Sequence, residues 1–381
     1  MDKLSPHIVI VIPSYNEPDL SHTLDSLFRC AGGDFCVEVL VVFNSWLISP
    51  PEAKEFNRAS YASALDYARR HNTPHFYLTP LLIEDLPGHQ TGAGLPRKIG
   101  MDEAIKHFNA LNKKKGIIVS LDADTTVAPN YLTELYKAFR KYKLNSATIN
   151  FHHPVEHLGE DDPLRLSTEL YELYLHYYRD ALEYTGFPYA YHTIGSAFAV
   201  TADTYLRVGG MGRQQAGEDF YFLHKVFPLE KTRFIDTTCV YPQARTSDRV
   251  PFGTGPAVAK MMEDDSICKL TYQAAAFDEL RQLFSLVDSF FGADNALISY
   301  KIQSLPPHLQ YFLQEDVFLS KMDELNTHTA NLSAFRKRFF SYFTAFKILK
   351  YMNAIHPAVY ELSDVRREYN LLRELKKRTA Y

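Results

Sequence analysis

The stretch that decides the fold is Ile8-Val9-Ile10-Val11-Ile12, followed by Pro13-Ser14-Tyr15-Asn16-Glu17. A continuous β-branched run is typical of a strand that is buried on both faces of a parallel sheet. The polar turn formers end this strand and place hydroxyl, amide and carboxylate groups just beyond it. Two more apolar strands are predicted at 37–43 and 117–121. Helical periodicity between the strands then predicts an α/β domain with a mostly parallel sheet.

The predicted elements change along the chain. The first part contains two predicted helices between its strands, and the middle section contains both helices and strands. We predict helices at 59–70, 97–108, 131–142 and 167–184, and strands at 146–151 and 197–201. From residue 259 onward Gly292 is the only glycine and helical periodicity dominates. We therefore predict two domains, an α/β domain at 1–258 and a helical region at 259–381.

Composition narrows the functional classes. The 381 residues are 46% hydrophobic and 23% charged, which fits a globular chain, and a net charge of -4 gives no reason to expect nucleic-acid binding. The four cysteines form no CxxC pair, so we expect reduced thiols and no thiolate zinc site. The apolar run at 8–12 is too short for a signal peptide, and no apolar stretch is long enough to cross a bilayer. We expect a cytoplasmic protein.

The segment Val119-Ser120-Leu121-Asp122-Ala123-Asp124 carries the strongest chemical signal. An apolar strand ends in two carboxylates, at the edge of the sheet where α/β proteins bind ligands. If the chain stays extended, alternation places Asp122 and Asp124 on the same side of the backbone. Such a pair suits Mg²⁺ or Mn²⁺, which take oxygen ligands and share them with substrate phosphates. The alternative is a solvated turn with an N-cap aspartate.

Two other segments carry weaker signals. Gly92-Ala93-Gly94-Leu95-Pro96-Arg97-Lys98 joins two glycines to two cations at the start of a helix, where a diphosphate is the natural ligand. Glu218-Asp219 follows the glycine run 209–212, and a carboxylate beside such a loop is a reasonable general base. An ordinary helix N-cap explains this acidic pair equally well.

Together with the turn after the first strand, these motifs resemble the family 2 glycosyltransferases with the GT-A fold, over residues 5–255. The resemblance implies a Rossmann-like mixed sheet flanked by helices. It also implies an inverting, metal-dependent transferase of polysaccharide biosynthesis, which moves a sugar from a nucleotide sugar, commonly a UDP-sugar, to an acceptor hydroxyl of a saccharide or a lipid-linked acceptor.

The resemblance assigns roles to individual residues. It implies that Asp124 and Asp122 bind Mg²⁺ or Mn²⁺, and that the Glu218–Asp219 pair is catalytic with Asp219 as the base. Donor binding is implied for Pro13, Tyr15, Asn16, Glu17, Gly94, Arg97 and Asp122. On physical grounds we add Asn44, Lys98 and the two arginines Arg245 and Arg249. Those two arginines bracket a loop closed by glycines and suit a leaving diphosphate. The alternatives are a surface pair of Arg245 with Asp248, or Asp248 as a third metal ligand.

Two departures from the family pattern refine this interpretation. Where many members have acidic residues after the second strand, this chain has Phe43-Asn44-Ser45, so Asn44 is left to hydrogen-bond a base. The Gln-x-x-Arg-Trp motif of processive synthases is missing from the sequence, which favours single addition. A sugar-1-phosphate nucleotidyltransferase and a non-catalytic GT-A-like scaffold are the competing functions.

One segment of the C-terminal region has two interpretations. The basic, aromatic segment 335–350 places Phe335, Phe339, Phe343 and Phe346 on one helical stripe. One interpretation is a peripheral helix on an anionic membrane at its cytoplasmic face. The other is a helix that packs its stripe on the catalytic domain.

Overall fold

The computed structural model describes residues 4–30, 32–87, 92–212, 217–245, 254–263, 268–315 and 317–379. The chain divides into two compact units. The first comprises Met1–Thr168 and Tyr191–Met262, and the second Glu169–Ala190 and Glu263–Tyr381. Segment 169–190 therefore groups with the C-terminal unit, although the sequence had placed it with the α/β domain.

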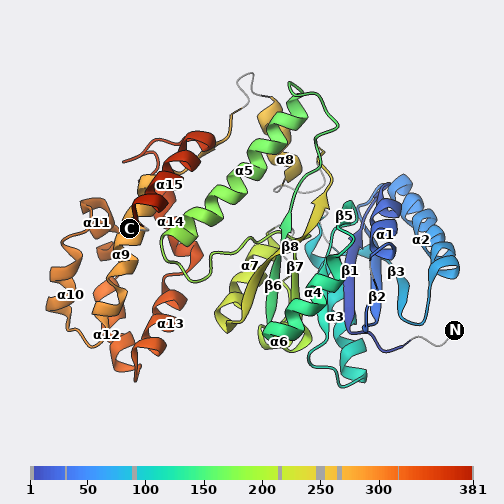
Figure 1. Ribbon diagram of the computed structural model, residues 1–381, viewed down its shortest axis with the longest axis horizontal. Helices are drawn as coiled ribbons and strands as arrows, with labels where there is room; N and C mark the ends of the chain where they lie inside the picture. Colours follow the sequence, from blue (N-terminus) through green and yellow to red (C-terminus); the bar gives the residue numbers. More distant parts are fainter. Residues whose placement is uncertain are drawn as a thin grey trace. The chain divides into compact units, whose positions relative to one another are not determined.

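The first unit contains an eight-stranded mixed sheet in the order β3-β2-β1-β4-β7-β6-β8-β5 (Figure 1). Its strands are β1 (Ile8–Ser14), β2 (Val37–Trp46), β3 (Phe76–Leu86), β4 (Ile117–Ser120), β5 (Thr125–Val127), β6 (Ser146–Phe151), β7 (Phe198–Thr201) and β8 (Thr232–Pro242). Strands β1 to β4 run parallel, β7 is antiparallel to both β4 and β6, and β8 is parallel to β6. The predicted α/β architecture with a mixed sheet is confirmed.

Strand directions place the chemistry-bearing segments at one edge of this sheet. Ile8 of β1 is in register with Val37 of β2 and Ile117 of β4, and all three are buried. These parallel strands therefore end at the same edge. Because β6 and β8 run in the same direction, they end there too, whereas the antiparallel β7 begins there. The segments after β1, β2, β4 and β8 and the segment before β7 thus share one edge.

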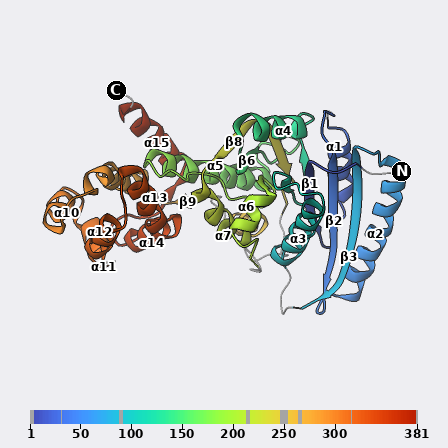
Figure 2. The same ribbon diagram turned by 90° about the horizontal axis from the view of Figure 1, so that it is seen from below.

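The first unit also contains helices, most of which pack beside the sheet. They are α1 (Leu20–Phe28), α2 (Pro51–His71), α3 (Gly94–Ala110), α4 (Tyr131–Tyr142), α6 (Ala202–Arg207), α7 (Glu218–Val226) and α8 (Thr254–Met262). Figure 2 shows α2 alongside β3. A Cβ atom at Gly100 of α3 would lie 2.4 Å from Cγ1 of Val11 in β1, so only glycine allows this close approach. Gly100 therefore lets α3 pack closely against β1.

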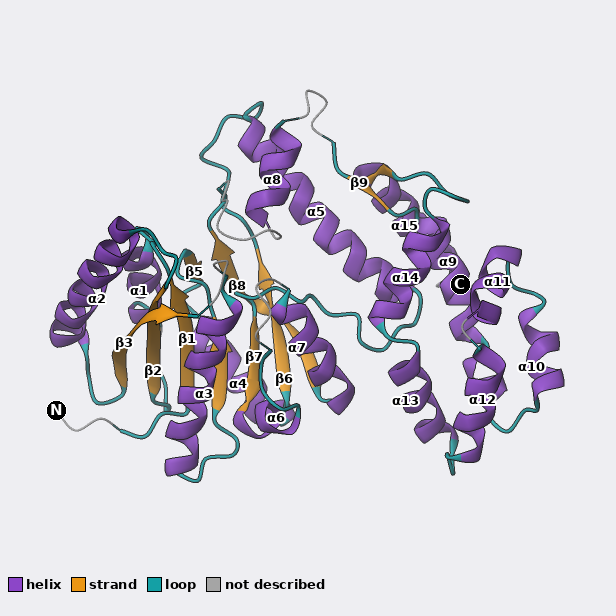
Figure 3. Ribbon diagram, turned by 180° about the vertical axis from the view of Figure 1, so that it is seen from behind, coloured by secondary structure: helices purple, strands orange, loops and turns teal. Residues whose placement is uncertain are grey.

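The second unit is largely helical (Figure 3). Helix α5 (Pro163–Tyr184) continues into it from the first unit. The others are α9 (Ala274–Ser285), α10 (Asn295–Ile302), α11 (Pro307–Glu315), α12 (Phe318–Thr327), α13 (Leu332–Tyr342), α14 (Ala345–Ile355) and α15 (Val365–Thr379). A short antiparallel pair, β9 (Leu270–Thr271) and β10 (Ser363–Asp364), completes the unit. No described helix is both long and apolar enough to cross a membrane.

The predicted continuous helix at 335–350 is wrong. The chain leaves α13 after Tyr342 and starts α14 at Ala345, with the Thr344 side chain as its N-cap. Phe335, Phe339 and Phe343 are fully buried, and their partners within the same unit include Phe284, Phe291 and Phe318. These three aromatic side chains form core contacts, whereas Phe346, the fourth member of the predicted stripe, is 37% exposed.

Candidate active site

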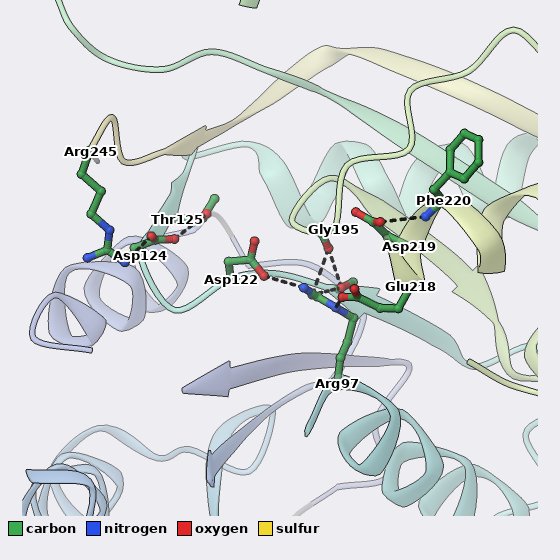
Figure 4. Close-up of polar contacts among 10 residues, drawn as sticks. Arg97, Asp122, Asp124, Thr125, Gly195, Glu218, Asp219, Phe220 and Arg245 are labelled. Atoms are coloured by element: carbon green, nitrogen blue, oxygen red, sulfur yellow. Dashed lines mark hydrogen bonds and ion pairs between the residues drawn. The ribbon is translucent and has the colours of Figure 1, made fainter. Parts of the chain in front are cut away.

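Two clusters of charged side chains, each centred on an arginine, lie at the edge of the sheet where the parallel strands end (Figure 4). One surrounds Arg97 of α3 and joins the end of β4 to the start of α7. The other surrounds Arg245, which follows β8, and includes the turn after β1. Asp122 belongs to the first cluster and Asp124 to the second.

Arg97 is the buried centre of the first cluster. Its side chain is 3% exposed. Its Nη2 donates to Oδ1 of Asp122 at 2.9 Å and its Nε to Oε1 of Glu218 at 3.1 Å, while its Nη1 donates to Oγ of Ser120 at 2.7 Å and to the carbonyl of Gly195 at 3.1 Å. Burial alone would lower the pKa of Arg97, but the nearby carboxylates Asp122 and Glu218 outweigh it and raise that pKa. Arg97 was expected to bind the donor. It is buried, and its hydrogen bonds hold the acidic segments at Asp122 and Glu218 in place.

Asp219 lies in the first turn of α7. Gly217 precedes this helix with a φ of +70°, which favours glycine, and the two acidic residues follow at the positive end of the helix dipole. Oδ1 of Asp219 accepts a hydrogen bond from the backbone N–H of Phe220 at 2.7 Å. Burial, together with the charge of Glu218, raises the pKa of Asp219 to about 7, although Arg97 acts in the opposite direction. A carboxyl group with this pKa suits a general base near neutral pH.

Gly195 is a site residue that the sequence did not reveal. A Cβ atom there would lie 2.8 Å from Nη2 of Arg97 and 3.2 Å from Oδ2 of Asp219. The missing side chain therefore lets both groups approach the segment before β7. A single glycine before a short strand is too common to have identified this position.

Arg245 is the centre of the second cluster. Its Nη1 donates to Oε1 of Glu17 at 3.1 Å, and its Nη2 donates to Oε2 of Glu17 at 2.5 Å and to Oδ2 of Asp124 at 2.6 Å. Burial and the charge of Asp122 raise the pKa of Asp124 to about 6, against the lowering effect of Arg245. Arg249 and Asp248, the other residues considered for this loop, lie outside the described residues.

Asp122 and Asp124 do not follow the predicted extended alternation. The chain turns after β4, and the N–H of Thr125 donates to the carbonyl of Asp122 at 3.1 Å. The turn directs Asp122 to Arg97 and Asp124 to Arg245 (Figure 4). The two carboxylates therefore have different partners, although each stays close enough to influence the other.

These residues fit a divalent cation that is shared with a substrate. The described ranges contain no group of three or more His, Cys, Asp or Glu side chains placed to hold a metal. Mg²⁺, however, is commonly bound by one or two carboxylates together with substrate phosphates. The two clusters place five carboxylates, those of Glu17, Asp122, Asp124, Glu218 and Asp219, around two guanidiniums. This excess of negative charge suits Mg²⁺ or Mn²⁺ at Asp124 and Asp122.

The turn after β1 is tied to the end of β2 by Asn57 of α2. Its Oδ1 accepts from the N–H of Asn16 at 2.8 Å, and its Nδ2 donates to the carbonyl of Asn44 at 2.6 Å. Asn16 itself has a φ of +48° and is exposed. Asn57 is a second residue that sequence reasoning missed, because a helical asparagine carries no local signal.

The remaining predicted donor residues have varied environments. Pro13 and Tyr15 are half-buried, whereas Asn44 is 2% exposed and Gly94 is buried at the start of α3. The ammonium group of Lys98 donates to Asp102 at 2.7 Å, one turn along α3.

Two hydroxyl groups at the same edge of the sheet have no hydrogen-bond partner in the part of the chain that the structure describes. Ser14 and Ser45, at the ends of β1 and β2, bury hydroxyl oxygens that bond no other described residue. Buried hydroxyls without partners are costly, so these two are ready to bond a ligand that enters between the two strand ends.

Comparison with known proteins gives structural similarity alone, since no family model and no curated protein sequence matches the chain. S. aureus TarS 1–349 in complex with UDP-GlcNAc is 12% identical with a TM-score of 0.44, covering 86% of this chain and 89% of that one. The match spans 42% of a longer S. aureus TarS chain. Mannosyltransferase PcManGT from Pyrobaculum calidifontis, in complex with GDP-Man and Mn²⁺, is 14% identical with a TM-score of 0.40, covering 92% and 84%. GalNAc-T7 with UDP, GalNAc and Mn²⁺ is 15% identical with a TM-score of 0.39, covering 68% and 48%.

Proposed function

We propose that this chain is an inverting, metal-dependent glycosyltransferase that adds a single sugar from a nucleotide sugar to an acceptor hydroxyl. The observation that carries the proposal is the shared support of Asp122 and Glu218 by Arg97, with Asp219 beside them. A carboxyl group suited to accept a proton is thereby held next to a pair of aspartates suited to a cation.

Asp219 acts as the base. Its Oδ2 removes the proton from the acceptor hydroxyl, while Phe220 fixes the other carboxylate oxygen through its N–H. The hydroxyl oxygen then forms a bond to the anomeric carbon as the bond from that carbon to the diphosphate breaks. Because the attack comes from the face opposite the leaving group, one displacement inverts the anomeric configuration.

Asp124 and Asp122 hold the cation, and the turn after β1 holds the nucleoside. When bound, Mg²⁺ or Mn²⁺ offsets the charge that develops on the departing nucleoside diphosphate. The unpartnered hydroxyls of Ser14 and Ser45 support a nucleoside position between β1 and β2, near Asn44. A UDP-sugar donor and a saccharide or lipid-linked acceptor are parts of the proposal.

The two competing functions predict different products. A sugar-1-phosphate nucleotidyltransferase would join a nucleoside triphosphate to a sugar phosphate and release pyrophosphate, and a scaffold would turn nothing over. Against a scaffold stands Asp219, whose pKa is raised by burial and by the charge of Glu218, because strongly raised pKa values cluster at functional sites.

The experiment measures nucleoside-diphosphate release with Mn²⁺ across UDP-, GDP- and TDP-sugars, and pyrophosphate release from a nucleoside triphosphate with a sugar phosphate. The proposal expects diphosphate release from at least one donor, its loss with a chelator, and no pyrophosphate. Pyrophosphate release, or no turnover of any of these sugar donors, would contradict it.

A further inference from the structure

The carboxylate proposed to bind the metal already has a cation beside it. Nη2 of Arg245 lies 2.6 Å from Oδ2 of Asp124, within ion-pair distance. The Asp124 side chain is 21% exposed, so the pair is largely shielded from solvent. A divalent cation at the same carboxylate oxygen would meet the positive charge of Arg245, which would repel it strongly at this depth.

Arg245 has a separate anchor that does not depend on Asp124. Glu17 accepts from both Nη atoms of Arg245, at 3.1 and 2.5 Å, and its own side chain is 3% exposed. This two-oxygen contact fixes the plane of the guanidinium. Arg245 can therefore give up Asp124 and still be held by Glu17, and the Nη2 donor that Asp124 occupied can then bind another anion.

We propose that Arg245 is a positioning residue that exchanges Asp124 for the diphosphate of the donor when the donor and its metal bind together. The proposal rests on the proposed function, since it requires a metal–donor complex at this edge. Phosphate oxygens match the guanidinium fork and replace the Asp124 carboxylate as hydrogen-bond acceptors. The exchange makes the metal alone a poor ligand and the metal with a nucleoside diphosphate a good one.

The test compares wild type with Arg245→Gln, and reads binding rather than turnover. Mn²⁺ alone is titrated and free Mn²⁺ is measured by electron paramagnetic resonance. UDP or GDP is then titrated at saturating Mn²⁺. We expect Arg245→Gln to bind Mn²⁺ alone about 5-fold to 100-fold more tightly, the usual range of coupling between two binding events. It should bind the nucleoside diphosphate more weakly by a factor within the same range.

Matched variants keep the result interpretable. Arg58 pairs with Glu84 on the surface of the same unit, so Arg58→Gln removes an arginine without touching the site and should match wild type. Arg245→Lys retains the charge but not the fork, and should bind Mn²⁺ with an affinity between those of wild type and Arg245→Gln. It also replaces Arg245→Gln if that variant does not fold.

The two opposite changes separate this role from a structural one, because a damaged site would weaken both ligands. Mn²⁺ affinity that is unchanged or weaker in Arg245→Gln overturns the exchange. If wild type still releases nucleoside diphosphate from a sugar donor, the proposed function survives that result. If wild type binds neither Mn²⁺ nor any nucleoside diphosphate, both proposals are overturned.

Discussion

Nη2 of Arg97 donates to Oδ1 of Asp122 at 2.9 Å, and Nε of the same guanidinium donates to Oε1 of Glu218 at 3.1 Å. One side chain of α3 thus connects the turn after β4 with the first residue of α7. The connection sets the distance between the proposed metal ligands and the proposed base. Buried arginine–carboxylate contacts of this kind hold a geometry well, but they are costly when one partner is removed.

Replacing Arg97 tests this connection. Arg97→Lys keeps a positive charge but cannot reach all four acceptors, so we expect kcat to fall by about 10-fold to 100-fold with little change in the KM for donor. Arg97→Ala leaves Glu218 buried without its ion-pair partner and should lower the free energy of unfolding by about 3–5 kcal/mol. Steady-state kinetics and urea unfolding measure these effects. Arg58→Lys, at an exposed pair, is the control, and a fall in its kcat as large as that of Arg97→Lys would refute the assignment.

The dependence of rate on pH tests the protonation state of Asp219. Because a base must be ionised, kcat/KM should fall about tenfold per pH unit below an apparent pKa near 7. Glu218→Gln removes a negative charge that raises this pKa, so the acid limb should move to lower pH. Glu134→Gln, which removes the pair with Lys137 on α4, should leave the profile in place. An acid limb that does not move in Glu218→Gln would argue against Asp219 as the titrating group.

The same raised pKa values predict an effect on stability. The pKa of Asp124 is about 6 and that of Asp219 about 7 in the folded protein, above the ordinary value of 3.8. The folded state therefore binds protons more tightly than the unfolded state, and this contribution is present below pH 4 and is lost as pH rises to 7. Asp124→Asn and Asp219→Asn should gain stability relative to wild type between pH 4.5 and pH 8, by on the order of 1–3 kcal/mol.

Urea unfolding at the two pH values measures this gain, with the exposed Asp66→Asn as the matched control. A gain in Asp66→Asn equal to that of the site variants would show that the effect does not come from burial. A relative stability of Asp219→Asn that is the same at both pH values would contradict the raised pKa.

Local sequence patterns predicted much of the fold. The predicted helix at 131–142 and strand at 146–151 coincide with α4 and β6, since their periodicity is uninterrupted. Strand β3 was missed because Pro80 interrupts it, yet β3 lies at the edge of the sheet, where a strand tolerates proline. The helix at 335–350 was wrong because the phenylalanine stripe continues past Thr344, the N-cap of a new helix, so the periodicity hides the break.

The sequence likewise predicted only part of the candidate site. Asp122, Asp124 and Asp219 belong to short motifs, so the sequence pointed to them directly. The support by Arg97 was not predictable, because its acidic partners lie 25 and 121 residues away along the chain. The contact of Arg245 with Glu17 was missed for the same reason, because the two residues are 228 apart along the chain.

The most direct test of the central claim is the turnover of Asp219→Asn with the best donor and acceptor at saturating Mn²⁺, at pH 8. Asparagine keeps the size of the side chain but cannot take up the acceptor proton. The account predicts a loss of roughly 10² to 10⁴ in kcat, with donor binding preserved. Turnover near that of wild type would contradict the assignment of Asp219 as the base.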